Sequence, residues 1–122
     1  MLRRKDWEKI RQSFNKKLVR CFLDEIILAH FNDCAFSGYD VIAFLQLELG
    51  VHISAATVYG SLYSMERKGL LVGHSTSRKR VYEVTERGNL TLHVVASKED
   101  IDRFRKQLLK RSKPIITQEL TG

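Results

Sequence analysis

Two consecutive helices are marked by the residues at their ends. Ser37 has the properties of an N-cap, and Asp40 three residues later supplies the acid of a capping box. Gly50 fits a left-handed helix end. A second N-cap, Ser54, follows at once, and that helix ends at Gly69. Because a turn of only about four residues joins them, the pair predicts a helix-turn-helix arrangement.

Two strand-like segments follow the helix pair. Residues 70–76 and 80–85 are rich in strand formers, and the polar connector Ser77-Arg78-Lys79 suits a hairpin tip. A hairpin placed directly after the second helix is the wing of a winged helix. We therefore expect a mainly α (α+β) fold, with a winged helix-turn-helix domain over residues 13–85.

A long helix is expected before this domain. From about residue 6 to residue 31 the chain has neither glycine nor proline, and its apolar residues recur every three or four positions. Cys21 falls on this apolar stripe, where we expect it to pack. The first half of the helix is polar and basic, and residues 1–12 form a basic N-terminal extension.

Another helix is expected after the wing, capped by Thr85. It carries a heptad seam of Leu90, Val94, Ser97, Ile101, Phe104 and Leu108. Residues 90–95 also alternate like a strand, with a fresh helix starting at 97–100, but we favour one helix over residues 86–112. The last residues, 113–122, are expected to form a frayed tail.

The seam on this last helix predicts a homodimer. One domain of this size offers too little surface of its own to cover it. We expect the first and last helices to form the dimer interface, through Phe14, Leu18, Phe22, Leu90, Val94, Ile101, Phe104 and Leu108.

Charge is distributed very unevenly along the chain. The net charge is +7. Residues 1–20 carry +6, and residues 21–60, which hold no Lys or Arg, carry −5. Residues 61–90 and residues 91–122 carry +3 each. Basic surface confined to a few segments is typical of polyanion binding; a well-solvated basic protein is the alternative. Arg3, Arg4 and Lys5 form either a disordered arm that adds non-specific affinity for a polyanion or a solvated end.

The second helix of the pair is the candidate DNA-contacting element. With Val58, Leu62 and Met65 facing inward, its outer face holds small and hydroxylated residues where a solvated helix normally carries Lys and Glu. Arg78, Lys79 and Arg80 add a basic wing tip, which either contacts phosphates or the minor groove or serves only solubility. Arg67 and Lys68 at the end of the helix also interact favourably with the helix dipole. The DNA-contacting residues are predicted to be Ser54, Ala56, Thr57, Tyr59, Gly60, Ser61, Tyr63, Ser64, Arg67, Lys68, Arg78, Lys79 and Arg80.

Other classes of protein have little support. The chain shows no glycine-rich phosphate loop, paired catalytic carboxylates or Ser/His/Asp arrangement, so we expect no enzyme and no cofactor. No histidine pair stands at a metal-ligand spacing near either cysteine, so we expect no metal site. Two cysteines are too few for a disulfide scaffold, and no apolar run suits a membrane span or secretion signal, which favours a cytoplasmic protein without a membrane partner.

Over about residues 23–88 the sequence resembles the PadR family of transcriptional regulators. Residues 37–41 are similar to the family's Gly-Tyr-Glu-Ile helix opening, and residues 54–62 to its Thr-Leu-Tyr-x-x-Leu segment, although Ala55 stands where the family usually has proline. Residues 65–71 match Leu-Glu-x-x-Gly-Leu, and residues 80–88 resemble the wing return strand with Thr-Glu-x-Gly.

The resemblance implies a dimeric winged helix that binds operator DNA, usually as a repressor, with effector ligands that differ between members. Only 34 residues follow Gly88, which is similar to the short type with a single dimerising helix. We therefore expect a homodimeric, sequence-specific regulator of double-stranded DNA on an inverted-repeat site; any small-molecule effector stays unspecified. The alternatives are a winged-helix protein-interaction module and a sequence-tolerant, chromatin-like DNA-binding protein.

Overall fold

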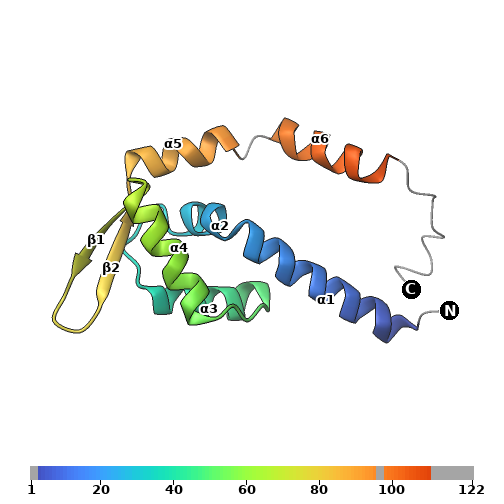
Figure 1. Cartoon of the computed structure of the whole chain (residues 1–122), viewed down its shortest axis with the longest axis horizontal. Coiled ribbons are helices and arrows are strands. Elements are labelled where there is room, and N and C mark those ends of the chain that lie inside the picture. The colour runs from blue at the N-terminus through green and yellow to red at the C-terminus, as the bar shows by residue number, and fades with distance from the viewer. Residues whose placement is uncertain (1–2, 96–97, 111–122) are drawn as a thin grey trace.

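The computed structural model describes residues 3–95 and 98–110 as six helices and one two-stranded sheet (Figure 1). The elements are α1 (Arg4–Cys21), α2 (Leu23–His30), α3 (Gly38–Leu49), α4 (Ala55–Arg67), β1 (Leu71–Ser75), β2 (Arg80–Val84), α5 (Glu86–Val95) and α6 (Lys98–Leu109). This order and the antiparallel β1–β2 pair confirm the predicted winged helix-turn-helix. The tail predicted at 113–122 lies outside the described residues.

The helix ends of the helix-turn-helix lie where the sequence predicts them. Ser37 and Asp40 form a complete capping box, in which the Asp40 N–H donates to Ser37 Oγ at 3.2 Å and the Ser37 N–H donates to the Asp40 carboxylate at 2.8 Å. Gly50 and Gly69 adopt left-handed conformations, with φ of 63° and 78°, which glycine reaches without steric cost. Gly50 thereby ends α3 at the tight turn that leads to Ser54, the N-cap of α4.

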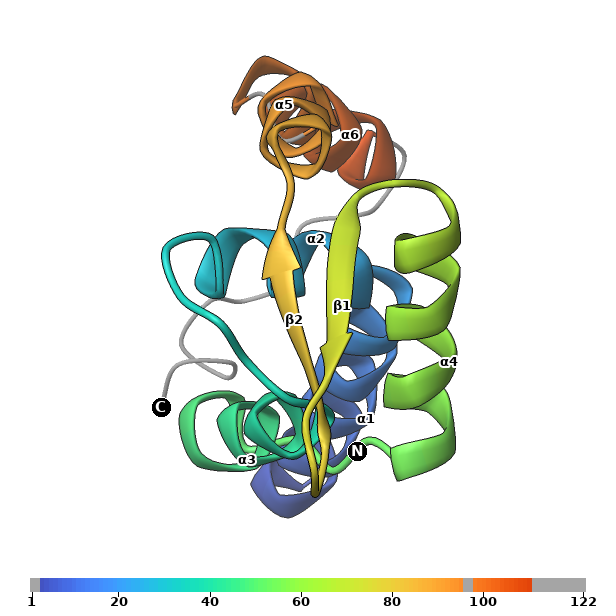
Figure 2. The same cartoon turned by 90° about the vertical axis from the view of Figure 1, so that its left-hand side faces the viewer.

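The wing is attached to the domain through β2. β1 and β2 pair in register from Leu71↔Val84 to Ser75↔Arg80. The backbones of Phe36, just before α3, and Tyr82 in β2 exchange two hydrogen bonds of 2.9 and 2.7 Å. The hairpin therefore extends outward from a fixed base beside α4 (Figure 2).

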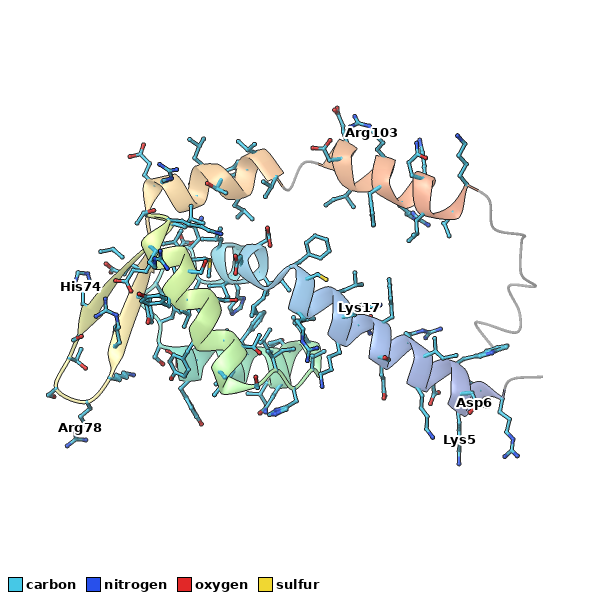
Figure 3. The ribbon with its side chains drawn as sticks, viewed as in Figure 1. Lys5, Asp6, Lys17, His74, Arg78 and Arg103 are labelled. Atoms are coloured by element: carbon cyan, nitrogen blue, oxygen red, sulfur yellow. The ribbon has the colours of Figure 1, made fainter. Side chains whose placement is uncertain are left out.

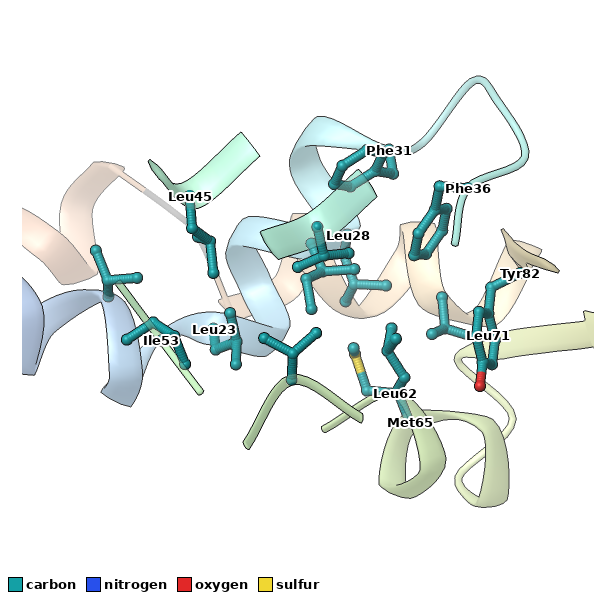
Figure 4. Packing of buried hydrophobic residues seen from close by; sticks show 14 of the residues in the cluster. Leu23, Leu28, Phe31, Phe36, Leu45, Ile53, Leu62, Met65, Leu71 and Tyr82 are labelled. Carbon is teal, nitrogen blue, oxygen red and sulfur yellow. The ribbon is translucent and has the colours of Figure 1, made fainter. Parts of the chain in front are cut away.

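One apolar core joins α2, α3, α4 and β1 (Figure 4). Val58, Leu62 and Met65 of α4 are fully buried, as the sequence predicts, so the opposite face of α4 is turned to solvent. Each such side chain contributes about 1.5–3 kcal/mol by leaving water. The core thereby fixes which residues α4 presents outward.

The prediction of a single helix over about residues 6–31 is wrong. Phe22, with φ −108° and ψ 24°, separates α1 from α2. The break lets α2 bury Leu23 and Ile27 in the core, while α1 extends away from it (Figure 1). Cys21, expected to pack, is exposed at the end of α1.

The helix predicted over 86–112 is divided between α5 and α6 in the structure, with 96–97 and 111–112 outside the described residues. Residues 90–95 are helical, which rules out the strand alternative. The Gly88 N–H donates to Thr85 Oγ1 at 3.0 Å, so Thr85 caps α5 as predicted. The seam is thus shared by two helices, of which α5 lies against α2.

Candidate nucleic-acid interface

The outer face of α4 has small residues at its centre and two aromatic side chains beside them. Tyr59 and Tyr63 are 47% and 62% exposed, and Gly60 between them and Ala56 about one turn earlier are exposed as well. A Cβ built on Gly60 would meet no atom within 4 Å. The backbone of α4 is therefore open to close approach at its middle, as a helix that enters a DNA groove requires.

Tyr59 is held in place by α3. Its ring lies directly over Gly38, where any side chain would overlap the ring atoms. This contact explains why Tyr59 is only half exposed, and it positions the phenol at the edge of the α4 face.

The start of α4 is favourable for an anion. Ser54 Oγ accepts the Thr57 N–H at 3.2 Å, and the two hydroxyl oxygens are hydrogen-bonded at 2.9 Å. The first turn of α4 contains no acidic residue, so the positive end of the helix dipole is not neutralised locally. Ser61 and Ser64, farther along the helix, are half-buried beside this face.

The end of α4 carries its cations. Arg67 and Lys68 are exposed, and the Arg67 guanidinium lies 5.6 Å from the centre of the Tyr63 ring. Such stacking orients the guanidinium along the helix face. Tyr63 and Arg67 therefore form one continuous surface.

At the wing, the three predicted basic residues have two different roles. Arg78 and Lys79 are exposed, and Arg78 points away from the molecule at the hairpin tip (Figure 3). Arg80 instead forms an ion pair with the Glu66 carboxylate on α4 and donates to Ser75 Oγ at 2.9 Å. The hydrogen bond to Glu66 raises the pKa of Arg80.

The Arg80–Glu66 pair changes what Arg80 contributes. Its charge is compensated within the protein, so Arg78 and Lys79 supply the positive charge at the tip, while Arg80 joins the wing to α4. Sequence reasoning grouped the three together because they are adjacent in the chain. The signal that it missed is Glu66, the acid on α4 that faces the wing.

The predicted dimer residues lie away from this face and are all solvent-accessible in the single chain. Phe22, Ile101 and Phe104 are 50%, 58% and 61% exposed. An apolar groove of about 550 Å³ runs between α1 and the α5–α6 segment, lined in part by Leu18, Phe22, Ile101 and Phe104. The structure thus separates a polar, hydroxyl-rich α4 face from an apolar face built on α1, α5 and α6.

A sequence profile of the transcriptional regulator PadR-like family matches residues 27–94, which is more than half of the chain. The chain belongs to the PadR-like family. The matched range includes all of α4 and the wing, and it leaves α1 and α6 outside. A comparison with curated proteins gives no significant match.

Solved structures of transcriptional regulators show the same fold, and two of them are covered over nearly their whole length. A PadR family transcriptional regulator from Eggerthella lenta is 22% identical, with a TM-score of 0.69 over 88% of this chain and 97% of its own. A transcriptional regulator from Clostridium thermocellum is 19% identical, with a TM-score of 0.67 over 80% and 96%. Bacillus subtilis PadR in complex with operator DNA is 24% identical, with a TM-score of 0.55 over 77% of this chain and 50% of its own.

Within the described residues, no cluster of three His, Cys, Asp or Glu side chains has the geometry to hold a metal ion. No helix in the same residues combines the length and the apolar character needed to cross a bilayer.

Proposed function

We propose that this protein is a sequence-specific regulator that binds double-stranded DNA as a homodimer. The observation that carries the proposal is the outer face of α4, which has an open glycine at its centre and lies beside a wing with a cationic tip. Small residues let a helix backbone approach base edges in the major groove, and hydroxyls bond to bases or phosphates. Arg78 and Lys79 then contact phosphates or the adjacent minor groove.

A second copy of the chain supplies the second half of the recognition surface. In one copy, the apolar side chains of α1, α5 and α6 are left in water, which disfavours a lone protomer. Pairing these faces about a two-fold axis presents two α4 helices, and an inverted-repeat site with half-sites about one DNA turn apart follows.

The regulatory direction that we propose is repression, as is usual in the family that the sequence resembles. A dimer seated on a site that overlaps a promoter excludes the transcription machinery, and no catalytic step is needed. Bacillus subtilis PadR has also been solved with p-coumaric acid, so we propose that this chain, too, responds to a small molecule. A reporter gene behind the selected operator tests the direction: expression should fall when the protein is present.

The deciding experiment is selection of bound sequences from a random DNA pool with the purified full chain. We expect an inverted repeat whose half-site centres are about 10 base pairs apart. If each subunit neutralises about three to five phosphates, a log–log plot of affinity against salt should have a slope of about −5 to −9. Failure to enrich any sequence would contradict a sequence-specific regulator.

Two observations favour a second function, a winged-helix module that binds another protein. Residues 21–60 are net acidic, and the α4 face has no cation before Arg67. Such a module would not retard random duplex DNA in a salt-sensitive way. A chromatin-like protein would bind random and selected DNA alike, whereas a regulator should prefer its operator by a factor of about 10³ or more.

A further inference from the structure

The helix α1 has two opposed faces. Lys5, Lys9 and Lys16 are spaced four and seven residues apart, so they share one side of the helix. Phe14 and Leu18 occupy the other side and belong to the apolar face described above. All three lysines are exposed. We call Lys5, Lys9 and Lys16 the α1 lysine stripe.

The stripe borders the turn of the helix-turn-helix. Lys9, Gln12, Ser13 and Lys16 form one wall of an open groove of about 470 Å³, and residues 50–52 of the α3–α4 turn form the other. No acidic side chain lines this groove. The groove ends two residues before Ser54, the N-cap of α4.

His52 adds an imidazole to the same groove. The Gln46 side-chain amide and His52 Nδ1 lie 3.0 Å apart and share a hydrogen bond. Two ammonium groups, a hydroxyl, an amide and an imidazole therefore surround one groove, a set of groups suited to phosphate oxygens.

The stripe also lies on the side of the molecule that carries the DNA-contacting elements. In Figure 3 Lys5 and Arg78 point toward the same side of the molecule, from its two ends. The start of α4 lies between them on that side in Figure 1. The wing tip, the start of α4 and Lys5 therefore share one side of the molecule.

We propose that the α1 lysine stripe, together with the groove that it shares with His52, binds DNA phosphates next to those contacted by the start of α4. The proposal rests on the proposed DNA-binding function and extends it to a helix that precedes the residues matched by the family profile. DNA is favoured over a lipid surface because Leu18, on the apolar side of α1 that a membrane-bound helix would insert, lines the groove toward α6.

The test compares two triple variants with the same loss of charge. In Lys5→Ala/Lys9→Ala/Lys16→Ala the stripe is removed. In Arg103→Ala/Lys106→Ala/Lys110→Ala three exposed cations are removed from α6 and the residue that follows it, on the side opposite the seam; of these, Arg103 is paired with Asp100 at 3.1 Å. Affinity for the selected operator is measured by fluorescence anisotropy over a range of salt concentrations, and thermal unfolding by circular dichroism checks that each variant folds.

We expect the stripe variant to lose at least about tenfold in affinity at 0.1 M salt and to flatten the slope by about 3 or more per dimer, because each phosphate contact adds about 0.9 to it. The α6 variant should change affinity less than about threefold. A third variant, Lys5→Arg/Lys9→Arg/Lys16→Arg, keeps the charge and should keep the wild-type slope.

Three outcomes overturn the inference. Equal slopes for the stripe and α6 variants would mean that α1 makes no phosphate contact, while wild-type binding to the operator would leave the proposed function standing. If the stripe variant bound the operator as the wild type does but no longer bound vesicles of anionic phosphatidylserine that the wild type binds, the stripe would be assigned to a membrane surface. Wild-type protein that binds no DNA would remove the proposed function itself, and this inference with it.

Discussion

Single glycines differ sharply in what surrounds them. Gly60, at the centre of the α4 face, has open space where a side chain would begin. Gly88, at the start of α5, is buried, and a Cβ there would overlap the carbonyl oxygen of Leu70 and lie 3.0–3.1 Å from Val84 and Leu28. One glycine is thus available for function, while the other is required for packing.

This contrast predicts opposite effects of alanine on stability. Gly88→Ala should lower the free energy of unfolding by about 1–3 kcal/mol, because a backbone oxygen cannot move aside as a side chain can. Gly60→Ala should raise it by up to about 1 kcal/mol, since alanine is the better helix former at an exposed position. Urea unfolding of the two variants measures both values. Equal midpoints for Gly88→Ala and the wild type would contradict the packing described here.

A larger residue at Gly60 should affect DNA binding and leave folding intact. Leucine there has room in the free protein, but its side chain would keep the α4 backbone away from base edges. We expect Gly60→Leu to lower operator affinity at least about tenfold, or about 1.4 kcal/mol, with Gly60→Ala in between. Anisotropy titrations with operator and random duplex measure this loss. Unchanged operator affinity would remove α4 from the major groove.

At the scale of elements, the wing depends on its connection to α4. The Arg80–Glu66 ion pair bridges 14 residues of sequence, and Arg80 also lies 5.8 Å from the Tyr82 ring centre. Because the pKa of Arg80 is raised from an already high value, the guanidinium stays charged at all ordinary pH values. The wing is thereby oriented against the helix that it accompanies.

Removing this pair should loosen the hairpin without unfolding the domain. In Arg80→Ala the β1–β2 amides lose the side chain that holds the wing to α4, so their hydrogen exchange should become faster. Arg78→Ala is the matched control, because it removes a charge at the tip that the described contacts leave facing solvent. It should flatten the salt slope by about 1 per subunit and leave the exchange rates unchanged. Similar exchange in the two variants would show that Glu66 does not fix the wing.

Helix ends could be predicted from the sequence because their causes are local. The capping residues Ser37 and Ser54 and the left-handed Gly50 act within a few residues of themselves, and all three lie where predicted. The break at Phe22 could not be predicted, because it arises from the packing of α2 into the core. The pairing of Arg80 was missed for the same reason, since it depends on where α4 lies beside the wing.

At the scale of the whole molecule, polar and apolar side chains are exposed on separate faces. The α4 face, the wing tip and the α1 lysine stripe are polar or cationic, whereas α6 presents Ile101, Phe104 and Leu108 to solvent, all more than half exposed. Protein–protein interfaces bury apolar side chains of this kind at their centres. In the proposed function, DNA binding and pairing use different surfaces, so each can be altered without changing the other directly.

Separate surfaces predict that loss of pairing weakens DNA binding from a distance. Ile101→Ala/Phe104→Ala should raise the dimer dissociation constant at least about 100-fold, or about 2.7 kcal/mol, because both side chains lose their burial in the partner. Sedimentation analysis should then show single chains at micromolar concentration, with operator affinity reduced and binding to an isolated half-site unchanged. Arg103→Ala/Lys106→Ala, on the other side of the same helix, should remain dimeric. A persistent dimer in the first variant would mean that α6 does not pair the chains, and the arrangement of the two α4 helices would have to be sought on another face.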